Sequence, residues 1–166
     1  MSKFSPLTEE ERAASGFTHR LDFSYQDIPA GIANNTSATW SAGYLPAIRA
    51  GDVLRECQLH LTTPFENTAD AAFNTSTLSF GTVTTATRYI SASEANVNGT
   101  EVLNVVPGAN PNDIYTATGN LILTLNSMAA KSLSNLNKGQ FYLLLKYDHT
   151  TDPAKEKAPP FINTTS

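Results

Sequence analysis

Hydrophobic and polar residues alternate along much of the chain, and the alternation is clearest over residues 53–61. The odd positions of this segment are apolar, with Arg55 as the exception, and the even positions are mainly polar. A period of two places the apolar side chains on one face of an extended chain. The segment is therefore predicted to be a half-buried β-strand, which Pro64 is expected to end.

Other segments with strand character are separated by turns rich in Gly, Pro and Asn. They cover residues 17–25, 38–44, 77–81, 87–91, 102–106, 120–124 and 140–148. About eight strands with turns between them are typical of a two-sheet sandwich. The predicted fold class is all-β, a two-sheet antiparallel β-sandwich or jelly roll with short helical turns and extended terminal arms. The sandwich is expected to span residues 17–149, and residues 127–136 permit one or two helical turns.

The segment 140–148 differs from the others because both of its faces are apolar. Phe and Leu residues occupy one face, while Tyr142 and Leu144 lie on the other. A strand of this kind is expected in the centre of a sheet, or covered by a partner. Tyr142 and Leu144 are therefore candidates for an interface if no second sheet covers them.

Each end of the chain is predicted to be an arm outside the sandwich. Residues 1–16 form the N-terminal arm, in which Thr8 and Glu11 have the spacing of a capping box and predict a short helix that ends by Gly16. Residues 150–166 contain three prolines and no strand pattern, and are expected to be an extended tail.

Both arms carry isolated apolar residues in polar sequence: Phe4, Leu7, Phe161 and Ile162. Burying one such side chain is worth about 1.5–3 kcal/mol, which is enough to dock an arm but not to fold it. These four residues are candidates for binding a partner. The alternative is that each arm packs on its own domain or stays disordered.

Composition narrows the classes of partner. The formal net charge is -4, so the chain has no broad basic field, and nucleic acid is not an expected partner. No apolar run has the length of a signal peptide or of a membrane span. We therefore expect a protein that is made in the cytoplasm and has no membrane partner.

Candidate catalytic and metal-binding groups do not assemble into a recognisable pattern. Cys57 could act as a nucleophile with one of the three histidines, but alternation places Cys57 and His60 on opposite faces of one strand. The histidines have no metal-ligand spacing, and no pair of carboxylates stands out. The sequence predicts a core role for Cys57, no catalytic residue, no metal or cofactor site, and no enzyme activity.

From residue 53 onward, the order of features resembles the jelly-roll head-decoration or cement proteins, and related virion proteins, of tailed bacteriophages. The segments that carry this resemblance are LHLTTPF (59–65), LSFGT (78–82), TRYI (87–90), NGTEV (98–102) and GQFYLLLKYD (139–148). The resemblance implies a two-sheet jelly roll, often a homotrimer, that is seated between capsid subunits and stabilises the shell without chemistry.

The leading hypothesis from the sequence is a capsid cement subunit on the surface of the virion. Its expected partners are the major capsid protein and further copies of itself, most simply in a trimer. A carbohydrate- or receptor-binding module of a tail fibre is the alternative, because the predicted loops contain many Asn, Thr and Tyr residues. An enzyme on a jelly-roll scaffold is a third hypothesis.

Overall fold

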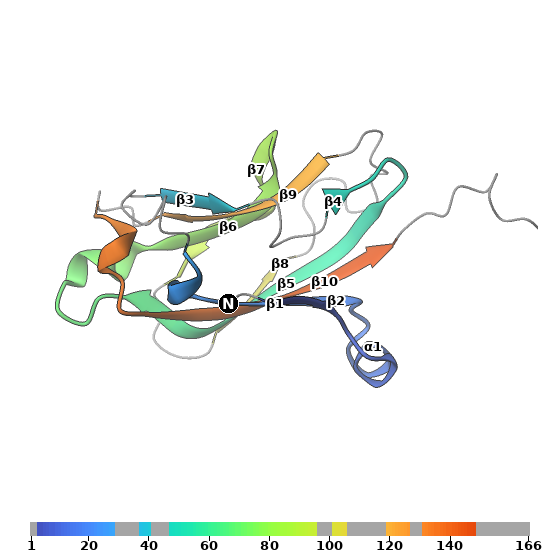
Figure 1. The fold of residues 1–166 in the computed structure, drawn as a ribbon, viewed down its shortest axis with the longest axis horizontal. Helices are drawn as coiled ribbons and strands as arrows, with labels where there is room; N and C mark the ends of the chain where they lie inside the picture. Colours follow the sequence, from blue (N-terminus) through green and yellow to red (C-terminus); the bar gives the residue numbers. More distant parts are fainter. Residues whose placement is uncertain are drawn as a thin grey trace, which may run out of the picture.

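The computed structural model describes residues 3–28, 37–40, 47–95, 101–105, 119–126 and 131–148, and in these ranges the chain forms two antiparallel sheets stacked face to face (Figure 1). Sheet A contains, in spatial order, β1 (Lys3–Pro6), β2 (His19–Ser24), β10 (Lys138–Asp148), β5 (Val53–Glu66) and β8 (Glu101–Val105). Sheet B contains β3 (Ser37–Trp40), β9 (Gly119–Asn126), β6 (Thr77–Thr82) and β7 (Thr85–Glu94), and β4 (Ala47–Ile48) also pairs with β9. The all-β two-sheet sandwich is confirmed.

The strand pairs are nested around one hairpin. β6 pairs with β7, and outside this hairpin β5 pairs with β8, β3 with β9, and β2 with β10. Apart from the β6–β7 hairpin, the chain from β5 to β10 crosses between the sheets at each connection. This nesting is the strand order of a jelly roll, and it makes β10 a central strand between β2 and β5.

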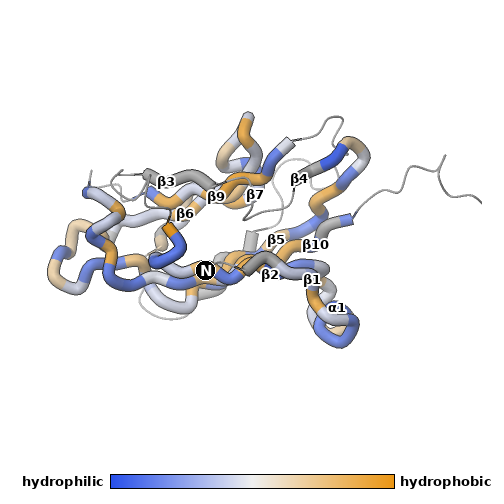
Figure 2. The backbone as a smooth tube through the Cα atoms, in the orientation of Figure 1, coloured by the Kyte–Doolittle hydropathy of each residue, from blue (hydrophilic) through white to orange (hydrophobic). Residues whose placement is uncertain are grey.

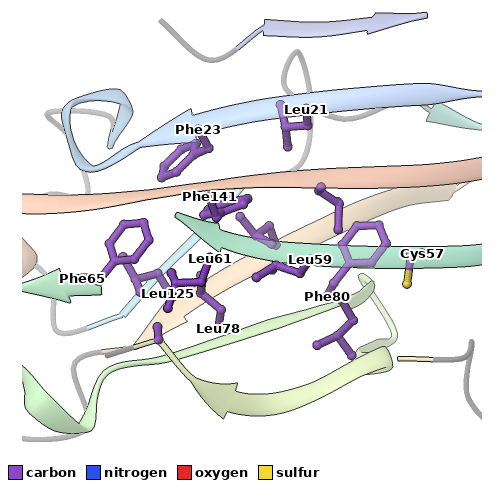
Figure 3. Close-up of a cluster of buried hydrophobic side chains, with 14 of the residues drawn as sticks. Leu21, Phe23, Cys57, Leu59, Leu61, Phe65, Leu78, Phe80, Leu125 and Phe141 are labelled. Atoms are coloured by element: carbon purple, nitrogen blue, oxygen red, sulfur yellow. The ribbon is translucent and has the colours of Figure 1, made fainter. Parts of the chain in front are cut away.

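The core lies between the two sheets. Alternate residues of each strand point inward, and the apolar side chains that meet there include Phe23, Leu59 and Phe141 from sheet A and Leu78, Phe80 and Leu125 from sheet B (Figure 3). Figure 2 shows hydrophobic stretches along strands of both sheets, whereas helix α1 (Glu9–Ser15) is largely hydrophilic. Burying each large apolar side chain is worth about 1.5–3 kcal/mol, so this layer dominates the stability of the fold.

Arg55 breaks the alternation of β5 because the strand bulges there. Lys146 of β10 pairs with Glu56, and the next residue, Tyr147, pairs with Leu54, so Arg55 is an extra residue in β5. The extra residue turns Leu54 into the core, where it is 2% exposed, and leaves Arg55 exposed. The exception in the sequence pattern is therefore a β-bulge.

Pro64 does not end β5, and the expectation that it would was wrong. The strand continues to Glu66, and the described pairing with β8 stops at Leu61. On the other side, β10 pairs with Thr63 and then with Glu66 through an irregular register, so no ladder hydrogen bond is required from Pro64. Proline is tolerated in a strand at such a position because it lacks only the backbone N–H.

The capping box at the N-terminal end is confirmed. Thr8 accepts a hydrogen bond from the backbone N–H of Glu11, and the Glu11 carboxylate accepts one from the N–H of Thr8 at 2.9 Å. Gly16 follows the helix with φ 76, a left-handed conformation that glycine adopts without strain. Among the described residues, no helix is long and apolar enough to cross a membrane.

Part of the N-terminal arm belongs to the sandwich. Residues 3–6 form the edge strand β1, in which Phe4 pairs with Leu21 of β2. Leu7 follows and is 8% exposed. Within residues 127–136, the described part contains one turn of 3-10 helix, Leu133–Asn135. The tail, residues 150–166, lies outside the described residues.

Candidate functional site

The outer face of sheet A, turned away from sheet B, is the first candidate site. β10 sends Phe141, Leu143 and Leu145 into the core, where each is at most 1% exposed. Tyr142 and Leu144 point to the opposite face and are half-buried. β10 is central, as its two apolar faces predicted, and the described residues place no second sheet over its outer side.

Three side chains from neighbouring strands form a stack on this face. Tyr142 lies in the middle, and its ring centroid is 4.4 Å from that of His60 on β5, with 11° between the ring planes. The guanidinium carbon of Arg20 on β2 lies 4.2 Å from the Tyr142 centroid. β2 and β5 flank β10 on opposite sides, so Arg20 and His60 enclose the tyrosine. We call these three residues the outer-face stack.

Hydrogen bonds hold both ends of the outer-face stack. Arg20 donates to the carboxylate of Asp22, with the Nη2 atom 2.6 Å from Oδ1, and this hydrogen bond raises the pKa of Arg20. The Nε2 atom of His60 lies 3.2 Å from the amide oxygen of Gln58. Burial lowers the pKa of His60, and the charge of Arg20 lowers it further. The stack is therefore a rigid array that favours a neutral imidazole.

The outer face carries balanced charges. Its described basic side chains are Arg20, Arg55 and Lys146, and its acidic ones are Asp22, Glu56 and Asp148. Two ion pairs, Arg20 with Asp22 and Arg55 with Asp148, join side chains that are each more than 40% exposed. Exposed pairs contribute at most about 1 kcal/mol. Neither sign of charge dominates this face, so shape and apolar area distinguish it more than net charge does.

The stack also limits what this face can bind. One side of the Tyr142 ring is covered by imidazole and the other by guanidinium, so the ring cannot serve as a platform on which a sugar or a base stacks. Leu144, in the next outward position of β10, supplies aliphatic surface beside it. This combination suits a protein surface better than a flat ring ligand.

Cys57 has the core role that the sequence predicts. The side chain is 0% exposed on the inner face of β5, and burial raises its pKa to about 12. His60 lies on the outer face of the same strand, so the two cannot form a nucleophile and base pair. Within the described ranges, no group of three or more His, Cys, Asp or Glu side chains could hold a metal ion.

A second candidate site is an open pocket of about 290 Å³ at the end of the sandwich where β2 ends and β10 begins. Its walls come from the end of β2, the turn of 3-10 helix Tyr25–Asp27, β5 and the start of β10. The lining residues are Ser24, Tyr25, Gln26, Thr63, Asn137, Lys138, Gly139 and Gln140. None of them was singled out from the sequence, because they come from three distant segments.

The structure places two of the four interface candidates from the terminal arms. Phe4 occupies β1, and Leu7 is buried within its own domain and has little surface left for a partner. Phe161 and Ile162 lie outside the described residues. Of the six interface candidates, the structure brings Tyr142 and Leu144 together on the outer face. It adds Arg20 and His60, which were not singled out from the sequence as interface residues.

Comparison with known proteins gives no relative: no protein-family model matches the chain, and no curated protein or solved structure matches it.

Proposed function

We propose that this chain is a virion structural protein, a cement or decoration subunit that binds the major capsid protein on the assembled head of a tailed bacteriophage. The observation that carries the proposal is the outer face of sheet A, where the central strand β10 presents Tyr142 and Leu144 half-buried. Jelly rolls occur in both viral capsid and lectin domains, so the fold supports the proposal only by analogy.

The outer face is suited to docking because it is already ordered. Arg20, Tyr142 and His60 hold one another in place, and their neighbours Asp22 and Gln58 are hydrogen-bonded to them. Ordering a long side chain at an interface costs about 0.5–1.5 kcal/mol, and a preorganised face avoids much of this cost. Most of the gain from covering Leu144 and Tyr142 then remains as binding free energy.

Cementing follows from binding across a seam between capsid subunits. A protein that binds the assembled shell but not the separated subunits stabilises the shell by mass action, in proportion to RT ln(1 + [L]/Kd). We further propose that the protein acts as a homo-oligomer, with a trimer as the expected form. Several docking faces in one particle raise its avidity for a repeating surface without any new contact.

The test is co-sedimentation with shells assembled from the major capsid protein of the same phage. The wild-type chain is expected to sediment with shells and to raise their resistance to heat. Leu144→Lys, which places a charge at the centre of the face, should weaken shell binding at least tenfold. The matched control is Val83→Lys, because Val83 is 65% exposed on the β6–β7 turn of the other sheet.

Equal shell binding by Leu144→Lys and wild type would place the interface elsewhere. Light scattering after size-exclusion chromatography tests the oligomer. A monomer at high concentration that also fails to bind shells would overturn the proposal.

A receptor-binding module of a tail fibre is the second candidate, favoured by the open pocket beside Tyr25 and Gln140. Immunogold labelling of intact virions separates the two candidates. Labels on the head support cement, whereas labels confined to the tail support the receptor-binding module.

A further inference from the structure

The open pocket beside Tyr25 has the chemistry of a binding site. Of its lining residues, three carry side-chain amides, two carry aliphatic hydroxyls and one is a tyrosine. An amide offers a donor and an acceptor in one plane, and a hydroxyl can do either. The pocket is thus rich in groups that pair with neutral polar ligands.

The walls of the pocket are fixed by contacts outside it. Ser24 donates through its backbone N–H to Asp27 at 2.9 Å, which holds the turn that carries Tyr25 and Gln26. Tyr25 packs against the hydrophobic core. Just before β10, the amide of Asn137 donates to the hydroxyl of Thr68 at 2.9 Å. These anchors let the site exist before a ligand arrives.

Gly139 brings the backbone of β10 close to the core at this point. Its φ is 145, and a Cβ atom there would lie 2.3 Å from the Phe65 ring. The absence of a side chain lets the strand lie directly on that ring. Gly139, which also lines the pocket, therefore fixes how β10 packs on the core at this end of the sandwich.

Several polar groups in the pocket are available to a ligand. The side chains of Thr63 and Gln140 make no hydrogen bond to another described residue. The Gln26 amide nitrogen donates to the Tyr25 hydroxyl at 3.3 Å, which leaves the Gln26 oxygen and the tyrosine O–H proton to pair with a ligand. These donors and acceptors all belong to residues that line the pocket.

The pocket has little net charge. Its cation, Lys138, lies 3.2 Å from a carboxylate oxygen of Glu66, which offsets the charge of the ammonium group. An anionic ligand would have to compete with this carboxylate. A volume of about 290 Å³ is at the lower end of the range for ligand sites, so it suits one small polar group.

We propose that this pocket binds a neutral carbohydrate, with one sugar residue held by Tyr25, Gln26, Thr63 and Gln140. The apolar part of Tyr25 contacts the sugar C–H groups, and the amides pair with its hydroxyls. The pocket adjoins the outer-face stack, because Gln140 and Ser24 are the next outward positions after Tyr142 and Asp22, but it shares no residue with the stack. The proposal does not depend on the cement function. The opening of the pocket to solvent favours the end or a branch of a glycan.

The test is a glycan array of neutral and sialylated oligosaccharides, followed by calorimetry with the best neutral glycan. Binding should survive 0.5 M NaCl, because exposed charge interactions are screened at that ionic strength and hydrogen bonds to a neutral ligand are not. Gln140→Ala and Gln26→Ala should each weaken binding about two- to tenfold, as expected for one lost hydrogen bond. Asn120→Ala, which removes an exposed amide from β9 of sheet B, is the matched control and should leave the affinity unchanged.

Backbone amide chemical shifts locate the ligand independently of these variants. The expected result is a set of shifts at Gln26, Thr63, Gly139 and Gln140 upon glycan addition. Binding of sialylated glycans alone, shifts confined to other parts of the domain, or no glycan binding at millimolar concentration would each overturn the proposal. No capsid shell is present in these measurements, so a failure to bind glycans leaves the cement proposal standing. Likewise, a failure to bind shells leaves the carbohydrate proposal standing.

Discussion

The phenol ring of Tyr142 lies almost parallel to the imidazole of His60, with 4.4 Å between their centroids and 11° between their planes. The two residues are direct partners in the β5–β10 register, and the guanidinium of Arg20 lies over the same tyrosine ring at 4.2 Å. A tyrosine on the outer face of a sheet is thereby held in one orientation, and this arrangement can be tested on the isolated domain.

Replacing Tyr142 by Leu keeps an apolar side chain but removes the ring. Aromatic pairs contribute about 0.5–1.5 kcal/mol, and a cation over an exposed ring about 0.5–1 kcal/mol. Tyr142→Leu is therefore expected to lower the free energy of unfolding by about 1–2 kcal/mol, measured by urea denaturation. Tyr142→Phe keeps the ring and should stay within about 0.5 kcal/mol of wild type. Equal free energies of unfolding for the two variants would show that the outer-face stack does not contribute to the stability of the domain.

His60 makes stability depend on pH. Burial and the charge of Arg20 lower its pKa in the folded chain, so between the folded and unfolded pKa values the unfolded chain binds more protons. The stabilisation is present when the pH is above the His60 pKa of the unfolded chain, about 6.5. It is lost as the pH falls through the lower His60 pKa of the folded chain.

The measurement is the free energy of unfolding at pH 7.5 and at successively lower pH, for wild type and for His60→Gln. The wild type should lose more stability than the variant across this window. Titration of the histidine ring signals by NMR gives the pKa directly, and a His60 value above that of an unfolded peptide would contradict the argument.

Gly139→Ala is expected to destabilise the domain strongly. The backbone at residue 139 has φ 145, and the new Cβ would lie 2.3 Å from the buried Phe65 ring. Strained backbone of this kind costs about 1–3 kcal/mol before the clash is counted, so a loss of at least about 2 kcal/mol is predicted. Gly119→Ala is the control, because a Cβ there meets nothing within 4 Å. Thermal unfolding that ranks the two variants equally would contradict this interpretation.

Cys57 reports on opening of the core. Its thiol is 0% exposed, and burial raises its pKa to about 12, so little thiolate is present at pH 8. A disulfide reagent such as DTNB should label the native domain at least about a hundredfold more slowly than the domain in urea. Labelling at the unfolded rate under native conditions would show that the core between the sheets is open.

Local sequence pattern was sufficient for most of the described strands and for the side that most of their residues face, although it missed β1 and the inward position of Leu54. Alternation predicted β5 with Cys57 and His60 on opposite faces, the double apolar character of 140–148 predicted a central strand, and the Thr8 and Glu11 spacing predicted helix α1. These features depend on side-chain period and on hydrogen bonds a few residues apart. The same patterns made Tyr142 and Leu144 candidates for the outer face.

The tertiary structure alone decided which strands are neighbours. The jelly-roll order brings Arg20 on β2 and His60 on β5 to the two sides of Tyr142, and it gathers three distant segments around the pocket. It also places the bulge that turns Leu54 inward and leaves Arg55 outside. An alternating strand can pair with any other strand that has a matching apolar face, and the entropy of loop closure changes only slowly with loop length. Strand partners are therefore selected by the packing of the whole core, which no local pattern encodes.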